Sequence, residues 1–515
     1  MRRIVALVAV ACVSLAGLTG CRRPEPEGLQ GATAIARPPA IHPDYSGCVV
    51  PPNLAPLNFS IQESGRRFVV EIRSQRGTPI RIDTGRPQVR IPEAEWHSLL
   101  QQNPGAPLTF DVWRQDVERH WQRFAPISNS ISADPVDPYL VYRLIKPLYN
   151  VYRDVGIYQR DLRTFRQSEV FHGRSFADGC VNCHAFPDRS TNRMAVGMRS
   201  GRYGNAVLLA EGDKVTKIGN AWGYTSWHPN GRLVAYSLNK VRQFFHPVRP
   251  ESRDVVDLDS DIFVYSIGEK SAQTTPALSD PNRLETYPTW SPDGKWLYFC
   301  SAPILWTDRE TVPPAHFDEV RYDLRRVAYD PQTGKWGDCE TVISGQRLGK
   351  SVLLPRISPD GRFLLVCMCK YGCFPIFQPD SDLWVMDLKT AALRRLEINS
   401  DWSESWHSWS RNSRWIAFSS KRNDGLFTRT YLSHVDPSGV FSKPLLVPQE
   451  DPNFYDSCLY TYSVPEFVTE PVQASARALA AAARSEPALT LEMPVTSMTP
   501  SKKKQPNDTP WQGRP

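Results

Sequence analysis

The residues best suited to chemistry in this chain are two cysteines and a histidine in the run Cys180-Val181-Asn182-Cys183-His184. This C-x-x-C-H spacing is typical of c-type haem attachment, in which the two thiols bond to the vinyl groups of a single porphyrin and the histidine binds its iron. Cysteine and histidine are scarce, with 11 and 10 among 515 residues, so chance explains the run poorly. The alternatives are a dithiol redox pair and half of a zinc site, but a zinc site would need further ligands at matching spacing. We predict one covalent haem c on Cys180 and Cys183, with His184 as proximal iron ligand.

The other face of the iron has three candidate ligands. Met194 and Met198 follow the haem run closely, in a chain with only 7 methionines, and methionine is a common sixth ligand in electron-transfer cytochromes. His172, on the other side of the run, is the alternative. Either methionine could instead be a core residue beside the first strand after the haem run.

The N-terminus is predicted to be an export signal. Two arginines precede the short apolar run Ile4–Leu18, and Leu18-Thr19-Gly20-Cys21 ends it with small residues before a cysteine. This ending resembles the bacterial lipobox, which implies removal of residues 1–20 and lipidation of Cys21; an ordinary secretory peptide is the alternative. The apolar run is short for a membrane span. We therefore expect an exported protein, lipid-anchored to a bacterial membrane and facing the periplasm.

Composition favours short strands over long helices. The chain has 15 Trp, 19 Tyr, 21 Phe and 45 Pro, a mixture that suits strands joined by turns. Its length allows several domains. The net charge of +7 is modest, and no basic stripe is interleaved with aromatic residues, so nucleic acid is not an expected partner.

One turn phrase recurs four times after the haem run. It centres on Pro-Asp-Gly or a close variant, where proline presets φ and glycine takes the strained position, and an apolar strand follows each copy. The copies are Trp227–Arg232, Trp290–Lys295, Ile357–Arg362 and Trp409–Arg414, the last with Arg411 and Ser413 in place of proline and glycine. Strand–turn–strand repeats of this length predict a β-propeller, in which each blade packs on its neighbours.

These phrases resemble the WD-like propeller repeats of the TolB family over roughly residues 205–464, which implies about six blades. The wider arrangement resembles a group of bacterial propeller cytochromes, exported lipoproteins in which a C-x-x-C-H run precedes TolB-type repeats. The segments Tyr371–Ile376 and Ser420–Gly425 look like further motifs of that group. Under this resemblance Asn192-Arg193-Met194 matches the family's position, which makes Met194 the first choice for the distal ligand.

The chain is therefore predicted to be mainly β. Strand-like runs bounded by Gly and Pro follow Cys48, with one short helix at Pro92–Leu100. Helical spacing of Tyr139, Tyr142 and Leu148 predicts a helical connector before the haem. The predicted segments are a signal peptide at 1–20, a tether at 21–47, a small β-sandwich-like domain at 48–127, the helical connector at 128–166, a haem c segment at 167–200, a TolB-like β-propeller at 201–466 and a disordered tail at 467–515.

The remaining cysteines have structural explanations. Apart from the signal, lipid and haem cysteines, these are Cys48, Cys300, Cys339, Cys367, Cys369, Cys373 and Cys458. Cys300 and Cys367 stand eight positions after the turn proline, where the other repeats have serine, so we predict packing roles for both. Cys369 and Cys373 are candidates for a hairpin-scale disulfide in an oxidising compartment.

Two functional hypotheses follow. The first is electron transfer or redox sensing by one haem, with the propeller docking a redox or cell-envelope protein. The second is a haem-dependent enzyme with its substrate at the propeller mouth. Its candidate residue is His407, which the repeat register places on an innermost strand, although a lone histidine is more often structural. No nucleophile–base pair, phosphate loop or carboxylate dyad accompanies His407, so electron transfer is preferred.

Overall fold

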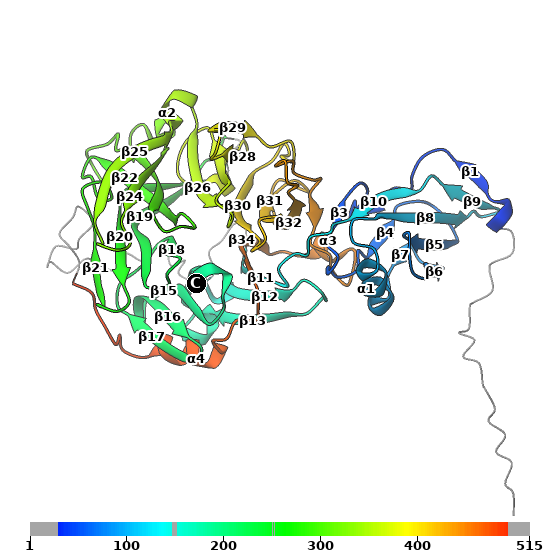
Figure 1. Cartoon of the computed structure of the whole chain (residues 1–515), viewed down its shortest axis with the longest axis horizontal. Helices are drawn as coiled ribbons and strands as arrows, with labels where there is room; N and C mark the ends of the chain where they lie inside the picture. The colour runs from blue at the N-terminus through cyan, green and yellow to red at the C-terminus, as the bar shows by residue number, and fades with distance from the viewer. Residues whose placement is uncertain (1–28, 147–151, 250, 252, 493–515) are drawn as a thin grey trace, which may run out of the picture.

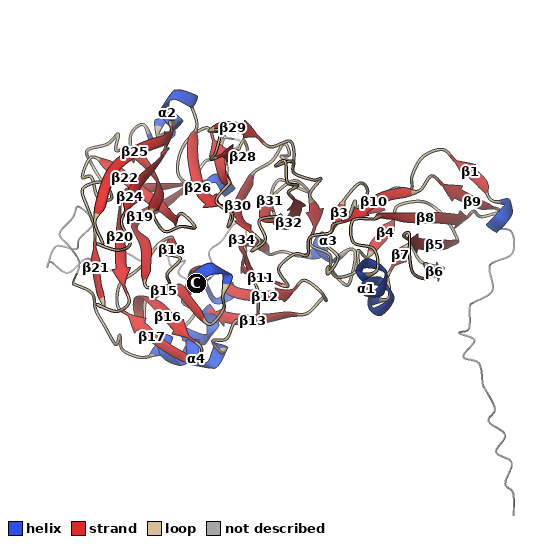
Figure 2. Ribbon diagram, viewed as in Figure 1, coloured by secondary structure: helices blue, strands red, loops and turns tan. Residues whose placement is uncertain are grey.

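The computed structural model describes residues 29–146, 152–249, 251 and 253–492. Within these residues, six four-stranded antiparallel sheets form a ring, and a smaller β-rich domain projects from one side of it (Figure 1). The chain is mainly β, as predicted, and helices are few and short (Figure 2). No helix in the described part is long and apolar enough to cross a membrane. The predicted signal peptide and Cys21 lie outside the described residues.

Five of the ring's sheets are each built from four consecutive strands. The first strand of each sheet contacts the first strand of the next, so these strands are innermost and surround a central channel. The sheets are β14 (Cys180–Ala185), β15 (Arg193–Ser200), β16 (Gly204–Glu211) and β17 (Lys214–Ile218); β18 (Thr225–Trp227), β19 (Leu233–Phe245), β20 (Arg253–Ser266) and β21 (Ser271–Gln273); β22 (Arg283–Trp290), β23 (Trp296–Pro303), β24 (Asp323–Tyr329) and β25 (Trp336–Ile343); β26 (Ser351–Ile357), β27 (Phe363–Cys369), β28 (Asp382–Asp387) and β29 (Ala392–Arg395); and β30 (Glu404–Trp409), β31 (Trp415–Ser420), β32 (Arg429–His434) and β33 (Leu445–Leu446).

The sixth sheet closes the ring with strands from two distant parts of the chain. Its innermost strand, β34 (Thr461–Val468), pairs with β11 (Tyr139–Ile145), followed by β12 (Gly156–Asp161) and β13 (Gln167–His172). The ring is thus a β-propeller closed by hydrogen bonds between its two ends. Because β13, β14 and β15 belong to sheets of the ring, the segment 167–200 is not a separate haem unit, and the propeller begins well before residue 201.

The predicted helical connector at 128–166 is wrong. Its apolar residues lie on strands, with Tyr139 and Tyr142 on β11. That strand has hydrogen-bonded neighbours on both edges and buried side chains on both faces, so its apolar residues do not alternate with polar ones. Because apolar residues occupy both faces of β11, their spacing in the sequence resembles that of a helix. Leu148 lies outside the described residues.

The smaller domain contains two sheets and one helix. Its strands are β1 (Thr33–Ile35), β2 (Ile41–His42), β3 (Val49–Val50), β4 (Phe59–Ile61), β5 (Arg67–Arg73), β6 (Ile80–Thr84), β7 (Gln88–Val89), β8 (Pro107–Gln115), β9 (Trp121–Phe124) and β10 (Ile127–Ile131). The predicted short helix is confirmed as α1 (Glu93–Gln101), whose Trp96 packs in the domain core. The tether prediction is wrong for residues 33–42, where β1 and β2 pair with other strands.

The C-terminal segment packs on the propeller for much of its length. After β34, the helix α4 (Ala476–Arg484) buries Leu479 and Ala483 in the core beside β13, β16 and β17 (Figure 1). Lys217 secures its end by donating hydrogen bonds to the carbonyls of Ala483 and Ser485. The prediction of a disordered tail is therefore wrong up to Leu491, which is buried. The other α-helices of the described residues are α2 (Gly345–Leu348) and α3 (Phe454–Ser457), each about one turn long.

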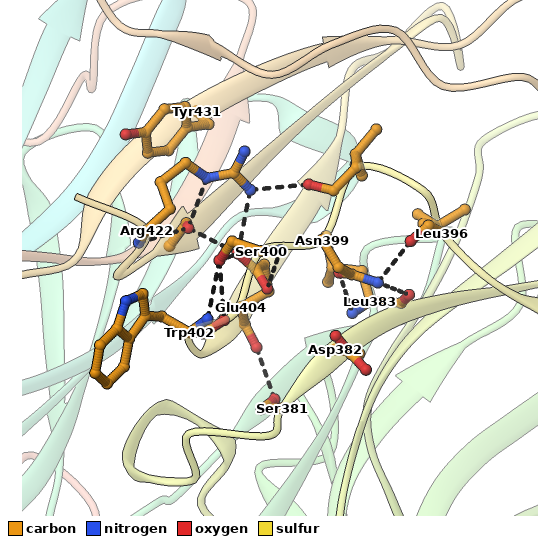
Figure 3. Close-up of polar contacts among 12 residues, drawn as sticks. Ser381, Asp382, Leu383, Leu396, Asn399, Ser400, Trp402, Glu404, Arg422 and Tyr431 are labelled. Carbon is orange, nitrogen blue, oxygen red and sulfur yellow. Dashed lines mark hydrogen bonds and ion pairs between the residues drawn. The ribbon is translucent and has the colours of Figure 1, made fainter. Parts of the chain in front are cut away.

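A buried carboxylate holds the start of the innermost strand β30 in place. Glu404 is fully buried and accepts hydrogen bonds from the hydroxyls of Ser400 and Ser420, at 2.7 and 2.8 Å, and from Arg422 at 3.1 Å (Figure 3). Its backbone carbonyl accepts a further bond from Ser381 of the neighbouring sheet. This network ties two sheets together next to the channel.

Replacement of Glu404 is expected to destabilise the propeller strongly. Glu404→Ala leaves Arg422 and two hydroxyls without their shared partner, and losing one member of a buried ion pair costs about 3–5 kcal/mol. The matched control is Glu397→Ala, because Glu397 is exposed and its loss should cost less than about 0.5 kcal/mol. Urea unfolding of both variants measures the difference. Equal unfolding midpoints would contradict the structural role of this network.

Candidate functional site

The C-x-x-C-H run lies on β14, the innermost strand of its sheet. Cys180 pairs with Arg199 and His184 pairs with Val196, with a bulge between them. Neither cysteine is paired in a disulfide, so both thiols are available. Since side chains alternate along a strand, the bulge decides which of these residues point into the channel.

Aromatic residues from the innermost strands meet in the middle of the channel. The rings of Tyr224 and Tyr287 lie 4.1 Å apart, and Trp406 lies 5.7 Å from the first and 6.1 Å from the second. Tyr287, Trp406 and the two residues at the same place in other sheets, Leu354 and Val464, have positive φ at strand bulges. This backbone conformation is uncommon for residues other than glycine. The φ values are 54° for Tyr287, 54° for Leu354, 31° for Trp406 and 53° for Val464. We call Tyr224, Tyr287, Leu354, Trp406 and Val464 the channel layer.

Cys183 belongs beside this layer. Burial chiefly raises the pKa of Tyr224, and the nearby Cys183 thiol raises it further. Trp406 of the channel layer lines two cavities; Val464 lines the first and Tyr224 the second. Of the two thiols of the haem run, Cys180 lines the second cavity, whereas Cys183 is buried and lines neither cavity.

The cavity at Cys180, which we call the aromatic cavity, has a volume of about 180 Å³. Its apolar wall includes Tyr224, Phe374, Phe377 and Trp406. Five cationic residues and no carboxylate complete the lining within the described residues: Arg143, Lys146, Arg199, Arg253 and Lys421. The guanidinium of Arg253 stacks on Phe377 at 3.8 Å. Burial, reinforced by Arg253, lowers the pKa of Lys421 to about 8.

This donor set and lining fit a haem in two respects. The free thiol of Cys180 stands at the wall of a cavity with an aromatic side, and the surrounding cations match the two propionates of a porphyrin. The buried Nε of Arg143 has no hydrogen-bond partner in the described structure, although its Nη1 donates to Asn182 at 3.2 Å. A carboxylate ligand would satisfy that nitrogen. The chemistry of the cavity is thus suited to the predicted cofactor.

His184 points away from the aromatic cavity. Its side chain is fully buried, and within the described residues neither ring nitrogen has a hydrogen-bond partner. Burial, and secondarily Arg143, lowers the pKa of His184 to about 3, so the imidazole is neutral and keeps a lone pair for a metal. Its Nε2 lies 3.8 Å from the Glu466 carboxylate on β34. In this conformation the orientation of His184 does not fit iron binding in the aromatic cavity.

The other predicted iron ligands are not brought to the aromatic cavity. Met194 and Met198 lie on β15, buried in the core between their sheet and the closing sheet, and neither lines a described cavity. His172 ends the outermost strand β13, where its Nδ1 accepts a hydrogen bond from the backbone of Arg174. The structure therefore shows packing and capping contacts for these three residues.

His407 lies on the innermost strand β30, where the repeat register predicted it. His407 occupies the same position on β30 as His184 on β14. His407 pairs with Phe418, the residue before Ser419, and His184 pairs with Val196, the residue before Gly197. Both of its nitrogens have partners: Nε2 lies 3.2 Å from the carbonyl of Leu365, and Nδ1 lies 3.6 Å from the thiol of Cys367. Burial lowers its pKa to about 3. These contacts are those of a structural histidine.

The remaining cysteines are core residues. Cys300 and Cys367 are fully buried, which confirms their predicted packing roles. The disulfide considered for Cys369 and Cys373 is absent among the described residues, because their thiols donate instead to the carbonyls of Tyr371 and Val255. Within the same residues, no group of three or more potential ligands is placed to hold a metal ion.

Sequence reasoning missed two charged residues at the opposite mouth of the channel. Arg356 and Glu466 line a cavity of about 320 Å³, which we call the mouth cavity, together with His184 and His407. Arg356 stands three positions before the turn proline, where the other marked repeats have Ser226, Thr289 and Ser408. The arginine at a repeat position that otherwise holds serine or threonine is the feature of the sequence that could have indicated this site.

Comparison with known proteins gives structural likenesses only. No protein-family model and no curated protein sequence matches the chain. Among solved structures, TolB from Acinetobacter baumannii is 14% identical with a TM-score of 0.42, covering 73% of this chain and 85% of that one. Hydrazine synthase from Kuenenia stuttgartiensis is 14% identical with a TM-score of 0.30, covering 50% and 64%. An oligogalacturonate lyase from Vibrio parahaemolyticus is 11% identical with a TM-score of 0.31, covering 73% and 100%.

Proposed function

We propose that this chain is a c-type haem lipoprotein that transfers electrons or senses redox state on the periplasmic side of a bacterial membrane. One haem c is attached to Cys180 and Cys183, and Cys21 carries the lipid. The TolB-like propeller, with each four-stranded sheet as one of six blades, and the preceding β-sandwich-like domain form the scaffold. The observation that carries the proposal is a C-x-x-C-H run with two free thiols, of which Cys180 lines an aromatic cavity that has five cations and, among the described residues, no carboxylate.

The iron ligands are part of the same proposal. His184 is the proximal ligand, and Met194 is the distal one, with Met198 and His172 as alternatives. Because His184 faces away from the aromatic cavity, its coordination requires the bulged part of β14 to rearrange when haem is attached. Bulges are local interruptions of strand pairing, so this part of β14 can change with fewer broken hydrogen bonds than a regular strand.

A redox or cell-envelope protein is the proposed partner, docked on the propeller. One haem carries one electron, and the described contacts of His407 offer no free acid–base group for the alternative enzyme. Electron transfer needs only the haem, its two cysteines and its iron ligands.

Carbon monoxide distinguishes electron transfer from a haem enzyme. If a protein side chain fills the sixth position, carbon monoxide added to the reduced protein should leave its absorption spectrum largely unchanged. Met194→Ala should then open the sixth position and allow rapid carbon monoxide binding. The control is Met386→Ala, which also removes a buried methionine from the propeller and should leave the iron closed to carbon monoxide. Rapid and complete carbon monoxide binding by the unmodified protein at neutral pH would instead support an open, catalytic haem.

A further inference from the structure

The mouth cavity holds a partly buried cation, Arg356, that forms no ion pair within the described residues. Arg356 donates through Nη1 to the Thr289 hydroxyl at 2.8 Å and to its neighbouring carbonyl at Pro355 at 3.0 Å. Within the described residues no carboxylate lies within ion-pair distance of its guanidinium. Burial lowers the pKa of Arg356, and the charge of Glu466 acts against this change. Removing part of such a charge from water has a cost that a partner of opposite charge offsets.

A carboxylate in the same cavity is also incompletely paired. Glu466 accepts a hydrogen bond from the backbone of Phe186 through Oε1, at 3.2 Å, and its Oε2 lies 3.8 Å from the neutral ring of His184. Arg356 lines the same cavity, but no ion pair joins it to Glu466 within the described residues. The cavity lining therefore offers one cationic group and one carboxylate that do not pair with each other.

Two hydroxyl groups of the same lining lack partners. The Oγ1 of Thr225 and the Oγ of Ser408 are buried without a hydrogen bond in the described structure, although native proteins satisfy nearly all such groups. Arg189 adds a second cation to the lining, and its Nε donates to the carbonyl of Trp409. Asp188 also lines the cavity, but it is largely exposed and lies 3.6 Å from Arg189.

We propose that the mouth cavity binds a small zwitterion that carries one carboxylate and one primary ammonium group. The ligand's carboxylate accepts hydrogen bonds from Arg356, whose forked guanidinium suits a planar anion. Its ammonium group donates to Glu466. A cavity of about 320 Å³ is at the small end of ligand sites, which restricts the ligand to the size of an amino acid or a short peptide. This inference rests on other observations than the proposed haem attachment, and it concerns the conformation in which His184 lines the mouth cavity.

Calorimetric titration of the purified full-length protein tests the proposal. The probes are glycine, β-alanine and 4-aminobutyrate, which differ in the distance between their charges, together with acetate and methylammonium as the two halves. At least one zwitterion should bind about tenfold or more tightly than either half. If no zwitterion binds at millimolar concentration, or if acetate binds as tightly as the best zwitterion, the proposal is overturned.

Variants assign the two charges. Arg356→Gln should weaken zwitterion binding about tenfold or more, since a hydrogen bond between charged groups is lost, while Arg347→Gln on the exposed helix α2 should change it less than about twofold. Glu466→Gln should reduce zwitterion affinity to that of acetate. Ser408→Ala, a small change that should not disturb folding, provides a further variant and should weaken binding severalfold. Equal binding by all four variants would exclude the mouth cavity as the site.

Discussion

Replacing both Cys180 and Cys183 by alanine is expected to abolish covalent haem entirely. Expressed with a cytochrome c maturation system, the wild-type protein should give the pyridine haemochrome spectrum of haem c and retain its haem after denaturation. The double variant should lack this signal, because no other cysteine in the described part of the chain lines the aromatic cavity. Absorbance of the denatured, acid–acetone-extracted protein measures the difference.

The matched control replaces Cys339 and Cys458, two part-buried cysteines outside both cavities. This variant should carry as much haem as the wild type. A colourless wild-type protein, or one that binds zinc through the same cysteines, would contradict the proposed function without bearing on the zwitterion site in the mouth cavity.

Trp406→Ala is expected to be among the most destabilising substitutions in the propeller. Trp406 is 4% exposed and contacts Tyr224 and Tyr287 in the channel layer, so its removal leaves a large cavity at the centre of the ring. Truncation of a buried tryptophan costs about 3–5 kcal/mol. The loss should appear as a lower urea midpoint for unfolding, followed by tryptophan fluorescence and circular dichroism.

The chain supplies a close control for this prediction. Trp402 lies four residues earlier and is 44% exposed, so Trp402→Ala removes the same side chain from a site with much less buried contact. It should cost about 1 kcal/mol or less. If both variants unfold at the same urea concentration, the channel layer does not stabilise the ring as its contacts indicate.

Local patterns were enough to predict much of the propeller. The turn at Trp290–Lys295 shows why: proline and glycine set its backbone conformation without help from distant residues. The same register predicted the buried places of Cys300 and Cys367, because equivalent positions in repeated sheets face the same neighbours. The C-x-x-C-H run likewise indicates its chemistry from spacing alone.

Tertiary structure decided what depends on contacts between distant segments. The strand β11 is stabilised by pairing with β34, more than 300 residues later, so its own apolar spacing imitated a helix. The direction of His184 depends on a bulge and on the closing sheet, which local spacing does not encode. Arg356 and Glu466 are 110 positions apart in the sequence but line the same cavity. They do so because the sheets close into a ring, which places equivalent positions of different sheets around one channel.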